Sequence, residues 1–250
     1  MPEQIIVKGN LISYNQYGAG DCAVIFLHGW RSNKEVWNGV VNEVIRLSSY
    51  QVYAIDLPGF GSSSAPKEPW RVGDYAEIIK GFVEQKELQA IIIVGHSFGG
   101  RVGIKLAAKY PSLVSKLILV DAAGFTNAAA KKNVMGFAAK IVKPLFRPKF
   151  MQGLRKSIYK IIGAEDYVAT PNLQQTFVNT INEDLSAEME KIICPTLIIT
   201  GENDKDTPVE YGQKMKNIIH NSKFIILSGA GHFSFLDQPE DFAKVLTEFI

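Results

Sequence analysis

Six short apolar runs, each ending in a turn-forming residue, alternate along the chain with segments long enough to form helices. Apolar runs of this length are typical of strands that helices cover on both faces. Parallel strands also need a crossover between them, and that crossover is usually a helix. The runs are AVIFLHG, VYAIDLPG, AIIIVGHS, LILVDAAG, TLIITGEND and FIILSGAGH, and helix-length segments include Glu35–Ser49, Val72–Leu88 and Pro208–Ile219. The pattern predicts an α/β fold with a mostly parallel central sheet flanked by helices.

Two further runs, IIVKG and LISYNQYG, come first and predict an opening hairpin, which brings the sheet to about eight strands. A chain of 250 residues can form one large domain, or a domain with a modest insertion. From about Phe125 to Lys191 there is no strand pattern, and this stretch is too long for a simple connection. We therefore expect a core of residues 1–124 and 192–250, with residues 125–191 inserted after the sixth strand as a helical cap, or lid.

The first half of the expected cap is basic, and its apolar residues are interleaved with the basic ones. No acidic residue occurs between Lys131 and Ala164. The basic residues are Lys131, Lys132, Lys140, Lys143, Arg147, Lys149, Arg155, Lys156 and Lys160. One interpretation is a solvated helix face. The other is a surface that attracts an anionic substrate or makes peripheral contact with a membrane. Periodicity alone does not decide between them.

Charge and hydropathy narrow the class of partner. The net charge of +2 is too small to indicate nucleic acid binding. No apolar run approaches the roughly 18 residues of a membrane-spanning helix, and the opening MPEQIIVKGN does not resemble a signal peptide. Cys22 and Cys194 each precede a strand-like run, so we expect two buried thiols rather than a disulfide. These features predict a cytoplasmic monomer or homodimer that acts on a small molecule, without inserting into a membrane.

The stretch IIIVGHSFGG places Ser97 between glycines at the end of an apolar run. A Gly-x-Ser-x-Gly pattern is weak evidence alone, but here a strand precedes it and a helical segment follows. A serine on so sharp a strand-to-helix turn needs small neighbours, because the flanking backbone approaches closely. Its hydroxyl then projects beyond the sheet, near the positive end of the next helix. We interpret Ser97 as a nucleophile.

A serine hydroxyl needs a base, and the chain has four histidines. His96 is adjacent to the serine and should point away from it, while His220 closes a helical segment, where a structural role suffices. His28 ends a strand and heads a Gly-Trp turn, where it can shape a loop. His232 follows the last strand in a glycine-bearing loop at the same edge of the sheet, so it is the predicted base.

The base in turn needs a carboxylate that fixes its tautomer. Asp204 and Asp206 lie just past the penultimate strand, and Asp121 follows another strand at the same edge. Asp204 is the first choice because it is nearer the strand end, and the other two remain alternatives. The oxyanion would be held by two backbone N–H groups, one from Phe98 after the serine and one from Trp30 in the loop after AVIFLHGW.

With these residues in place, the chain resembles the α/β-hydrolase fold family, in its serine-nucleophile branch, over essentially its whole length. The matching pieces are HGW, DLPGFGSS, GHSFGG, GENDKDTP and GAGHFSFLDQPEDF. The resemblance implies that the acid is Asp204, three residues after the glycine of GEND, that Trp30 and Phe98 are the oxyanion donors, and that residues 125–191 are a lid over the pocket.

The implied activity is carboxylesterase-like hydrolysis through an acyl-enzyme, with no metal and no organic cofactor. Because the base must be neutral, activity should rise through roughly pH 6 to 7. Carbon–carbon bond hydrolases, lactonases, thioesterases, perhydrolases and hydroxynitrile lyases are built in the same way, so the substrate stays open. A receptor that binds a small molecule without turning it over is the alternative outside enzymes.

Overall fold

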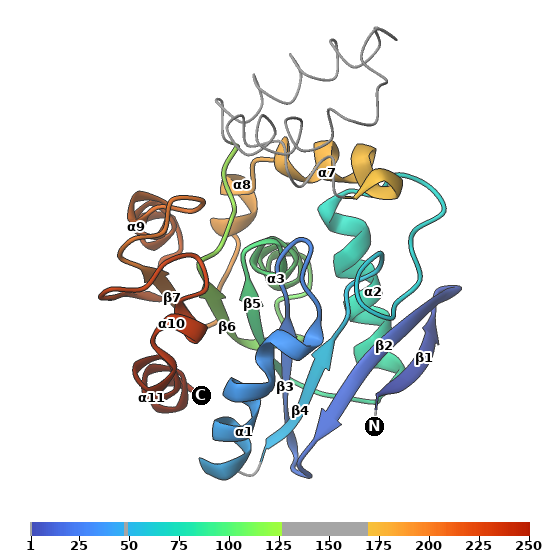
Figure 1. The fold of residues 1–250 in the computed structure, drawn as a ribbon, viewed down its shortest axis with the longest axis horizontal. Helices are drawn as coiled ribbons and strands as arrows, with labels where there is room; N and C mark the ends of the chain where they lie inside the picture. Colours follow the sequence, from blue (N-terminus) through green and yellow to red (C-terminus); the bar gives the residue numbers. More distant parts are fainter. Residues whose placement is uncertain (1, 48–49, 127–169) are drawn as a thin grey trace, which may run out of the picture.

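The computed structural model describes residues 2–47, 50–126 and 170–250, and these form a three-layered α/β structure (Figure 1). An eight-stranded sheet lies at its centre in the order β1-β2-β4-β3-β5-β6-β7-β8. Strand β1 is antiparallel to β2 and β2 to β4, whereas every other pair is parallel. The strands are β1 Glu3–Val7, β2 Asn10–Tyr17, β3 Cys22–Leu27, β4 Tyr50–Ile55, β5 Ile91–His96, β6 Val114–Val120, β7 Thr196–Gly201 and β8 Ser222–Leu227. The predicted eight-stranded, mostly parallel sheet is confirmed.

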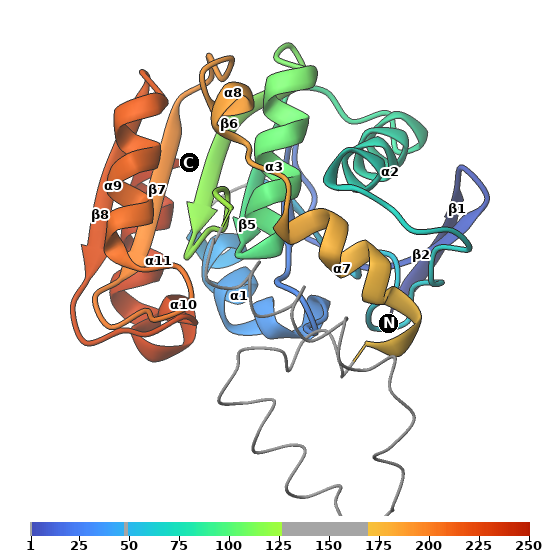
Figure 2. The same ribbon diagram turned by 90° about the horizontal axis from the view of Figure 1, so that it is seen from above.

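Helices cover both faces of the sheet, which explains why its central strands are largely apolar (Figure 2). Helices α2, α3 and α9 pack on one face, and α1 and α11 pack on the other. Their bounds are α1 Asn38–Leu47, α2 Val72–Gln85, α3 Phe98–Lys109, α9 Val209–Ile218 and α11 Pro239–Phe249. All six residues of β5 are buried, whereas the edge strand β8 is largely half-exposed. The segment expected as one helix from Glu35 begins instead with a 3-10 turn, η1 Lys34–Trp37, before α1.

Part of the predicted cap falls within the described residues. Residues 170–191 contain the short η3 Pro171–Leu173 and the helices α7 Gln174–Ile181 and α8 Ser186–Met189, and this described part includes no strand. Residues 127–169, with all nine basic residues from Lys131 to Lys160, lie outside the described residues. The cap as a unit, and the division into core and cap, therefore stay predictions.

A buried arginine joins the two ends of this insertion to the core. Arg101, on the second turn of α3, donates to the carbonyl of Phe125 at 2.9 Å and to the carbonyl of Glu183 at 2.7 Å. Leu185 N also donates to the carbonyl of Gly124 at 2.9 Å. The segments that enter and leave the insertion are thus held side by side against α3.

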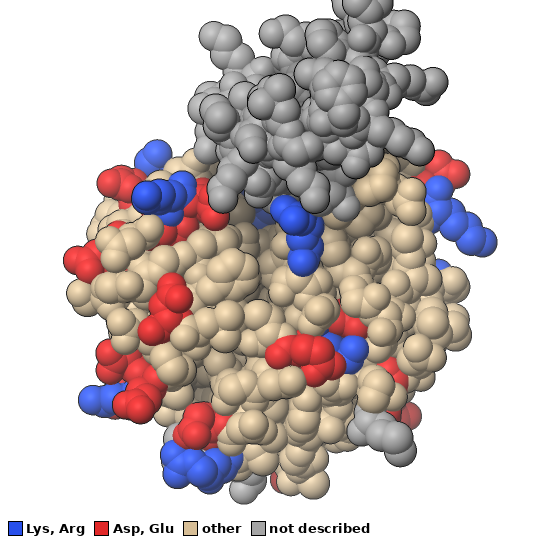
Figure 3. All heavy atoms as spheres, viewed as in Figure 1, with Lys and Arg blue, Asp and Glu red and all other residues tan. Residues whose placement is uncertain are grey.

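One expectation about the cysteines is wrong. Cys194 is buried as expected, but Cys22 is exposed, because it is the first residue of β3 and comes before the part of the strand that pairs with β5. Both cysteines are free, and a cytoplasmic location stays a prediction. Among the described residues, no helix is both long enough and apolar enough to cross a membrane. On the face shown in Figure 3, the charges of the described residues are scattered and do not form a patch of one sign.

Candidate active site

Ser97 lies on a strained turn between β5 and α3. Its backbone has φ 49° and ψ −107°, a left-handed conformation that is unfavourable for a residue with a side chain. The two glycines of the motif allow the turn to pack. A Cβ on Gly95 would come within 2.5 Å of the carbonyl oxygen of Gly99, and a Cβ on Gly99 would overlap the carbonyl of Leu27. The pattern therefore reflects close approach of three backbone segments around the serine.

His232 follows β8, in the loop before the short helix α10 Ser234–Asp237, and faces this turn. Its Nε2 lies 3.1 Å from Ser97 Oγ. Its backbone is held by His96, whose Nε2 lies 2.7 Å from the carbonyl oxygen of His232. A carbonyl can only accept, so His96 donates through Nε2. His96 thus points away from the serine hydroxyl, as expected, and supports the His232 loop.

Asp204 completes the hydrogen-bonded series. Its Oδ2 lies 2.9 Å from His232 Nδ1. Its Oδ1 accepts the backbone N–H groups of Asp206 at 2.8 Å and Thr207 at 3.0 Å, and the hydroxyl of Thr207 lies 2.7 Å from Oδ2. Since Oδ1 has two other donors, the carboxylate is fixed with Oδ2 towards the imidazole.

The two alternative acids have other roles. Asp206 contributes its N–H to Asp204, and its carboxylate is exposed. Asp121 is buried and accepts hydrogen bonds from Gly201 N at 2.8 Å, Ser234 N at 3.0 Å and Ser234 Oγ at 2.7 Å. Asp121 therefore ties the ends of β6 and β7 to α10. The imidazole of His232 contacts Asp204 instead.

The protonation of these groups follows from burial and pairing. Burial alone would lower the pKa of His232, but the hydrogen bond and the charge of Asp204 outweigh it and raise this pKa above its ordinary value. Burial likewise opposes ionisation of Asp204, yet His232 and Thr207 together lower its pKa. Asp121 differs, because burial raises its pKa to about 6 despite its hydrogen bonds.

Trp30 and Phe98 flank the turn. Phe98 is the first residue of α3, and among the described residues neither its N–H nor that of Trp30 has a backbone acceptor. The loop that carries Trp30 packs on the serine, since a Cβ on Gly29 would lie 3.3 Å from Ser97 Cβ. The Trp30 ring contacts Phe98 at 5.1 Å and Phe177 of α7 at 5.2 Å between ring centres.

The described residues include one group of three side chains that could ligate a metal ion. The ligand atoms of Asp204, Asp206 and His232 all lie within 4.8 Å of one another. Two of these residues form the series that ends at Ser97, so a cation bound here would compete with the Asp204–His232 hydrogen bond. These three side chains therefore fit an acid–base role better than the role of ligands to a resident metal ion.

Three contributors were not identified from the sequence. Thr207 donates to Asp204 from both its backbone N–H and its hydroxyl. Lys34 and Asp56 form a buried ion pair at 2.7 Å. Asp56 follows a strand at the same edge of the sheet as the other candidate acids, and this position was the available signal.

Comparisons with known proteins give the family and the proteins that this chain resembles. Residues 24–245 match the family model described as "Alpha/beta hydrolase family". The chain is 26% identical to the AB hydrolase superfamily protein YisY of Bacillus subtilis, over 90% of each chain. It is 24% identical to a 2-hydroxy-6-oxononadienedioate/2-hydroxy-6-oxononatrienedioate hydrolase of a Pseudomonas species, over 96% of this chain and 91% of that one. Among solved structures it resembles an esterase from Exiguobacterium antarcticum, with a TM-score of 0.81 and 26% identity over 100% of this chain and 99% of that one.

Proposed function

The chain belongs to the alpha/beta hydrolase family, and from that membership we propose that it is a serine hydrolase that cleaves carboxylic esters of small to medium size. The observation that carries the proposal is the unbroken series from Asp204 Oδ2 through His232 to Ser97 Oγ, with contacts of 2.9 and 3.1 Å. These distances suit proton transfer between a nucleophile and its base.

In the first step, neutral His232 takes the Ser97 proton at Nε2 while Oγ attacks the ester carbonyl carbon. His232 carries its own proton on Nδ1 and donates it in a hydrogen bond to Asp204 Oδ2. The proton stays on the ring, and the negative charge of Asp204 stabilises the imidazolium that forms. The carbonyl oxygen becomes an oxyanion between the N–H groups of Trp30 and Phe98, the latter at the positive end of α3.

In the second half of the reaction, the tetrahedral intermediate collapses and the alcohol leaves with the proton from His232. Water then enters, His232 removes one of its protons, and the resulting hydroxide attacks the acyl carbon. Collapse releases the acid and returns the proton to Ser97. These side chains account for every proton and electron pair, so the proposal includes no metal or organic cofactor.

We also propose that residues 125–191 act as a cap that selects the substrate. The support comes from α7, whose Phe177 packs on the ring of Trp30 and whose Thr176 accepts the N–H of Trp70 at 3.0 Å. A described helix of the insertion therefore touches the residue assigned to the oxyanion site.

A carbon–carbon bond hydrolase is the second candidate. The observation that favours it is the similarity to the Pseudomonas hydrolase over 96% of this chain. The same nucleophile and base would serve, with a carbon leaving group in place of an alcohol.

Active-site labelling tests the proposed nucleophile. A fluorophosphonate probe should label the wild type and fail to label Ser97→Ala. Ser228→Ala should label like the wild type, because Ser228 is exposed and its hydroxyl donates to Glu202 at 2.8 Å rather than to a base. An unlabelled wild type would favour a receptor that binds without catalysis.

A panel of nitrophenyl esters from acetate to laurate then tests the substrate class. Turnover of at least one chain length is expected. If none is hydrolysed while a vinylogous 1,5-diketone is cleaved, the carbon–carbon hydrolase replaces the esterase.

A further inference from the structure

His28 is a fully buried histidine in the loop that supplies Trp30. It comes directly after β3, and Gly29 and Trp30 follow it. The proposed reaction gives it no proton to transfer. Its two ring nitrogens nevertheless both have partners in the backbone.

The partners of His28 fix its tautomer. Nε2 lies 3.0 Å from the backbone nitrogen of Leu57, which can only donate, so Nε2 must carry a lone pair. The proton of the neutral ring is then on Nδ1, which lies 2.7 Å from the carbonyl oxygen of Gly29 and donates to it. Burial lowers the pKa of His28 to about 4, which keeps the ring neutral near pH 7.

The Gly29 carbonyl controls the direction of the Trp30 N–H. Both groups belong to one planar peptide unit, and the described residues contain no cis peptide bond. In a trans peptide the C=O and the N–H point to opposite sides. Gly29 O is held by His28 Nδ1–H and by Ser32 N at 3.2 Å, so the opposing N–H has a fixed direction.

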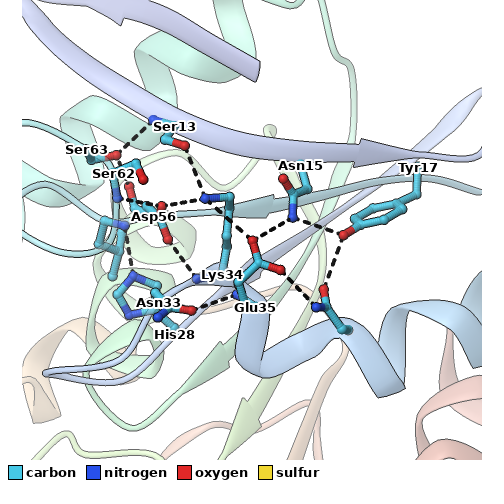
Figure 4. A network of polar contacts seen from close by, with 12 residues as sticks. Ser13, Asn15, Tyr17, His28, Asn33, Lys34, Glu35, Asp56, Ser62 and Ser63 are labelled. Carbon is cyan, nitrogen blue, oxygen red and sulfur yellow. Dashed lines mark hydrogen bonds and ion pairs between the residues drawn. The ribbon is translucent and has the colours of Figure 1, made fainter. Parts of the chain in front are cut away.

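The other side of the ring rests on a buried ion pair. Asp56, next to Leu57, accepts hydrogen bonds from Lys34 Nζ at 2.7 Å, Lys34 N at 2.7 Å and Ser62 N at 2.9 Å (Figure 4). Both charged side chains are almost completely buried. Figure 4 shows the His28 ring beside this group of contacts. The pair fixes the backbone at Leu57 and, through Lys34, the end of the loop that carries Trp30.

Resting on the proposed function, we propose that His28 is the positioning residue of the oxyanion hole. Its Nδ1–H holds the Gly29–Trp30 peptide so that the Trp30 N–H is directed at the developing oxyanion. The Leu57 N–H, which donates to the lone pair on Nε2, fixes the tautomer in which Nδ1 carries the proton that is donated to Gly29 O.

Two substitutions of His28 each keep one of the two hydrogen bonds of the ring and remove the other. His28→Asn keeps an amide donor near the position of Nδ1 and loses the acceptor for Leu57 N–H. His28→Gln keeps an acceptor near Nε2 and loses the donor to Gly29. We expect His28→Gln to lose about 10- to 100-fold in kcat with little change in KM, approaching the 10²–10³-fold cost of removing an oxyanion donor. His28→Asn should lose several-fold less.

Affinity for a trifluoromethyl ketone gives a second readout, because its adduct with serine carries an oxyanion. The inhibition constant should rise in His28→Gln in proportion to the fall in kcat/KM. Ile12→Ala removes a buried side chain of β2 and serves as the destabilised control, with a lowered melting temperature and unchanged kinetics. In ¹⁵N spectra of the wild type, the His28 ring should be protonated at Nδ1.

The outcomes separate this inference from the proposed function. Equal kinetic losses in the two variants, or an Nε2-protonated ring, would overturn the role of His28 while leaving a reactive Ser97 in place. A wild type that neither reacts with fluorophosphonate nor hydrolyses any ester would overturn both.

Discussion

His96 makes the stability of the fold depend on pH. The ring is buried to 1% exposure, it donates through Nε2 to His232 O, and its Nδ1 has no hydrogen-bond partner. Burial, reinforced by the nearby charge of His232, lowers the pKa of His96 to about 3. The folded chain therefore keeps this ring neutral throughout the range in which the unfolded chain protonates it.

The size of the effect follows from proton linkage. Below pH 6.5 the unfolded state binds a proton at His96 and the folded state does not, so the free energy of unfolding falls as the pH falls. Each pH unit in this window corresponds to about 1.4 kcal/mol. Between pH 6.5 and pH 5, His96 should therefore reduce the free energy of unfolding by about 2 kcal/mol.

The perturbation that isolates this contribution is His96→Gln. A glutamine keeps an amide donor near the position of Nε2 for the carbonyl of His232, and it does not titrate. Urea unfolding at pH 7.5 and pH 5 gives the loss of stability in each protein. The loss should be about 2 kcal/mol smaller in His96→Gln than in the wild type, because the other titrating groups are common to both.

His220→Gln is the matched control, because it makes the same substitution at an exposed histidine. Its loss between the two pH values should equal that of the wild type. If His96→Gln also loses as much stability as the wild type, the ring is not kept neutral by burial and the reasoning is refuted.

Three further predictions concern the site and its supports. The rise of kcat/KM with pH should have its midpoint above 6.5, because the carboxylate partner of His232 outweighs burial and raises its pKa; a midpoint below 6 in a pH–rate profile would contradict this. Gly99→Ala places a methyl group against the carbonyl of Leu27 and should cost about 1–3 kcal/mol in urea unfolding, with slower fluorophosphonate labelling; wild-type values for both would refute the packing argument. Lys34→Met leaves the buried Asp56 carboxylate without its cation and should cost about 3–5 kcal/mol by chemical denaturation, whereas a cost under 1 kcal/mol would show that the backbone donors suffice.

The architecture was predictable from the sequence because burial on both faces imposes a pattern that can be read locally. Each central strand, such as β5, is a continuous apolar run that ends where the chain turns. The strand ends also located Ser97 and His232, since parallel strands bring their carboxyl ends to one edge. The apolar pattern predicted burial less well at Cys22. This residue is exposed because it is the first residue of its strand.

Contacts between distant segments were not predictable in the same way. Lys34 and Asp56 are 22 residues apart, and His28 reaches Leu57 across 29 residues. Nothing in the local sequence around Lys34 indicates that a lysine will be buried there. Its partner becomes evident only when β3 and β4 pair and bring the loops that follow them together.

The three candidate carboxylates show why position at the sheet edge does not by itself assign an acid. Asp121, Asp204 and Asp206 all lie at this edge, so the sequence could rank them but not separate them. In the structure both oxygens of Asp121 are occupied by Gly201 and Ser234. Asp204 is held at Oδ1 by two backbone donors, and its Oδ2 accepts from the Thr207 hydroxyl and from His232 Nδ1. An acid in such a site is therefore defined by the way its other donors orient the carboxylate, with one oxygen turned towards the imidazole.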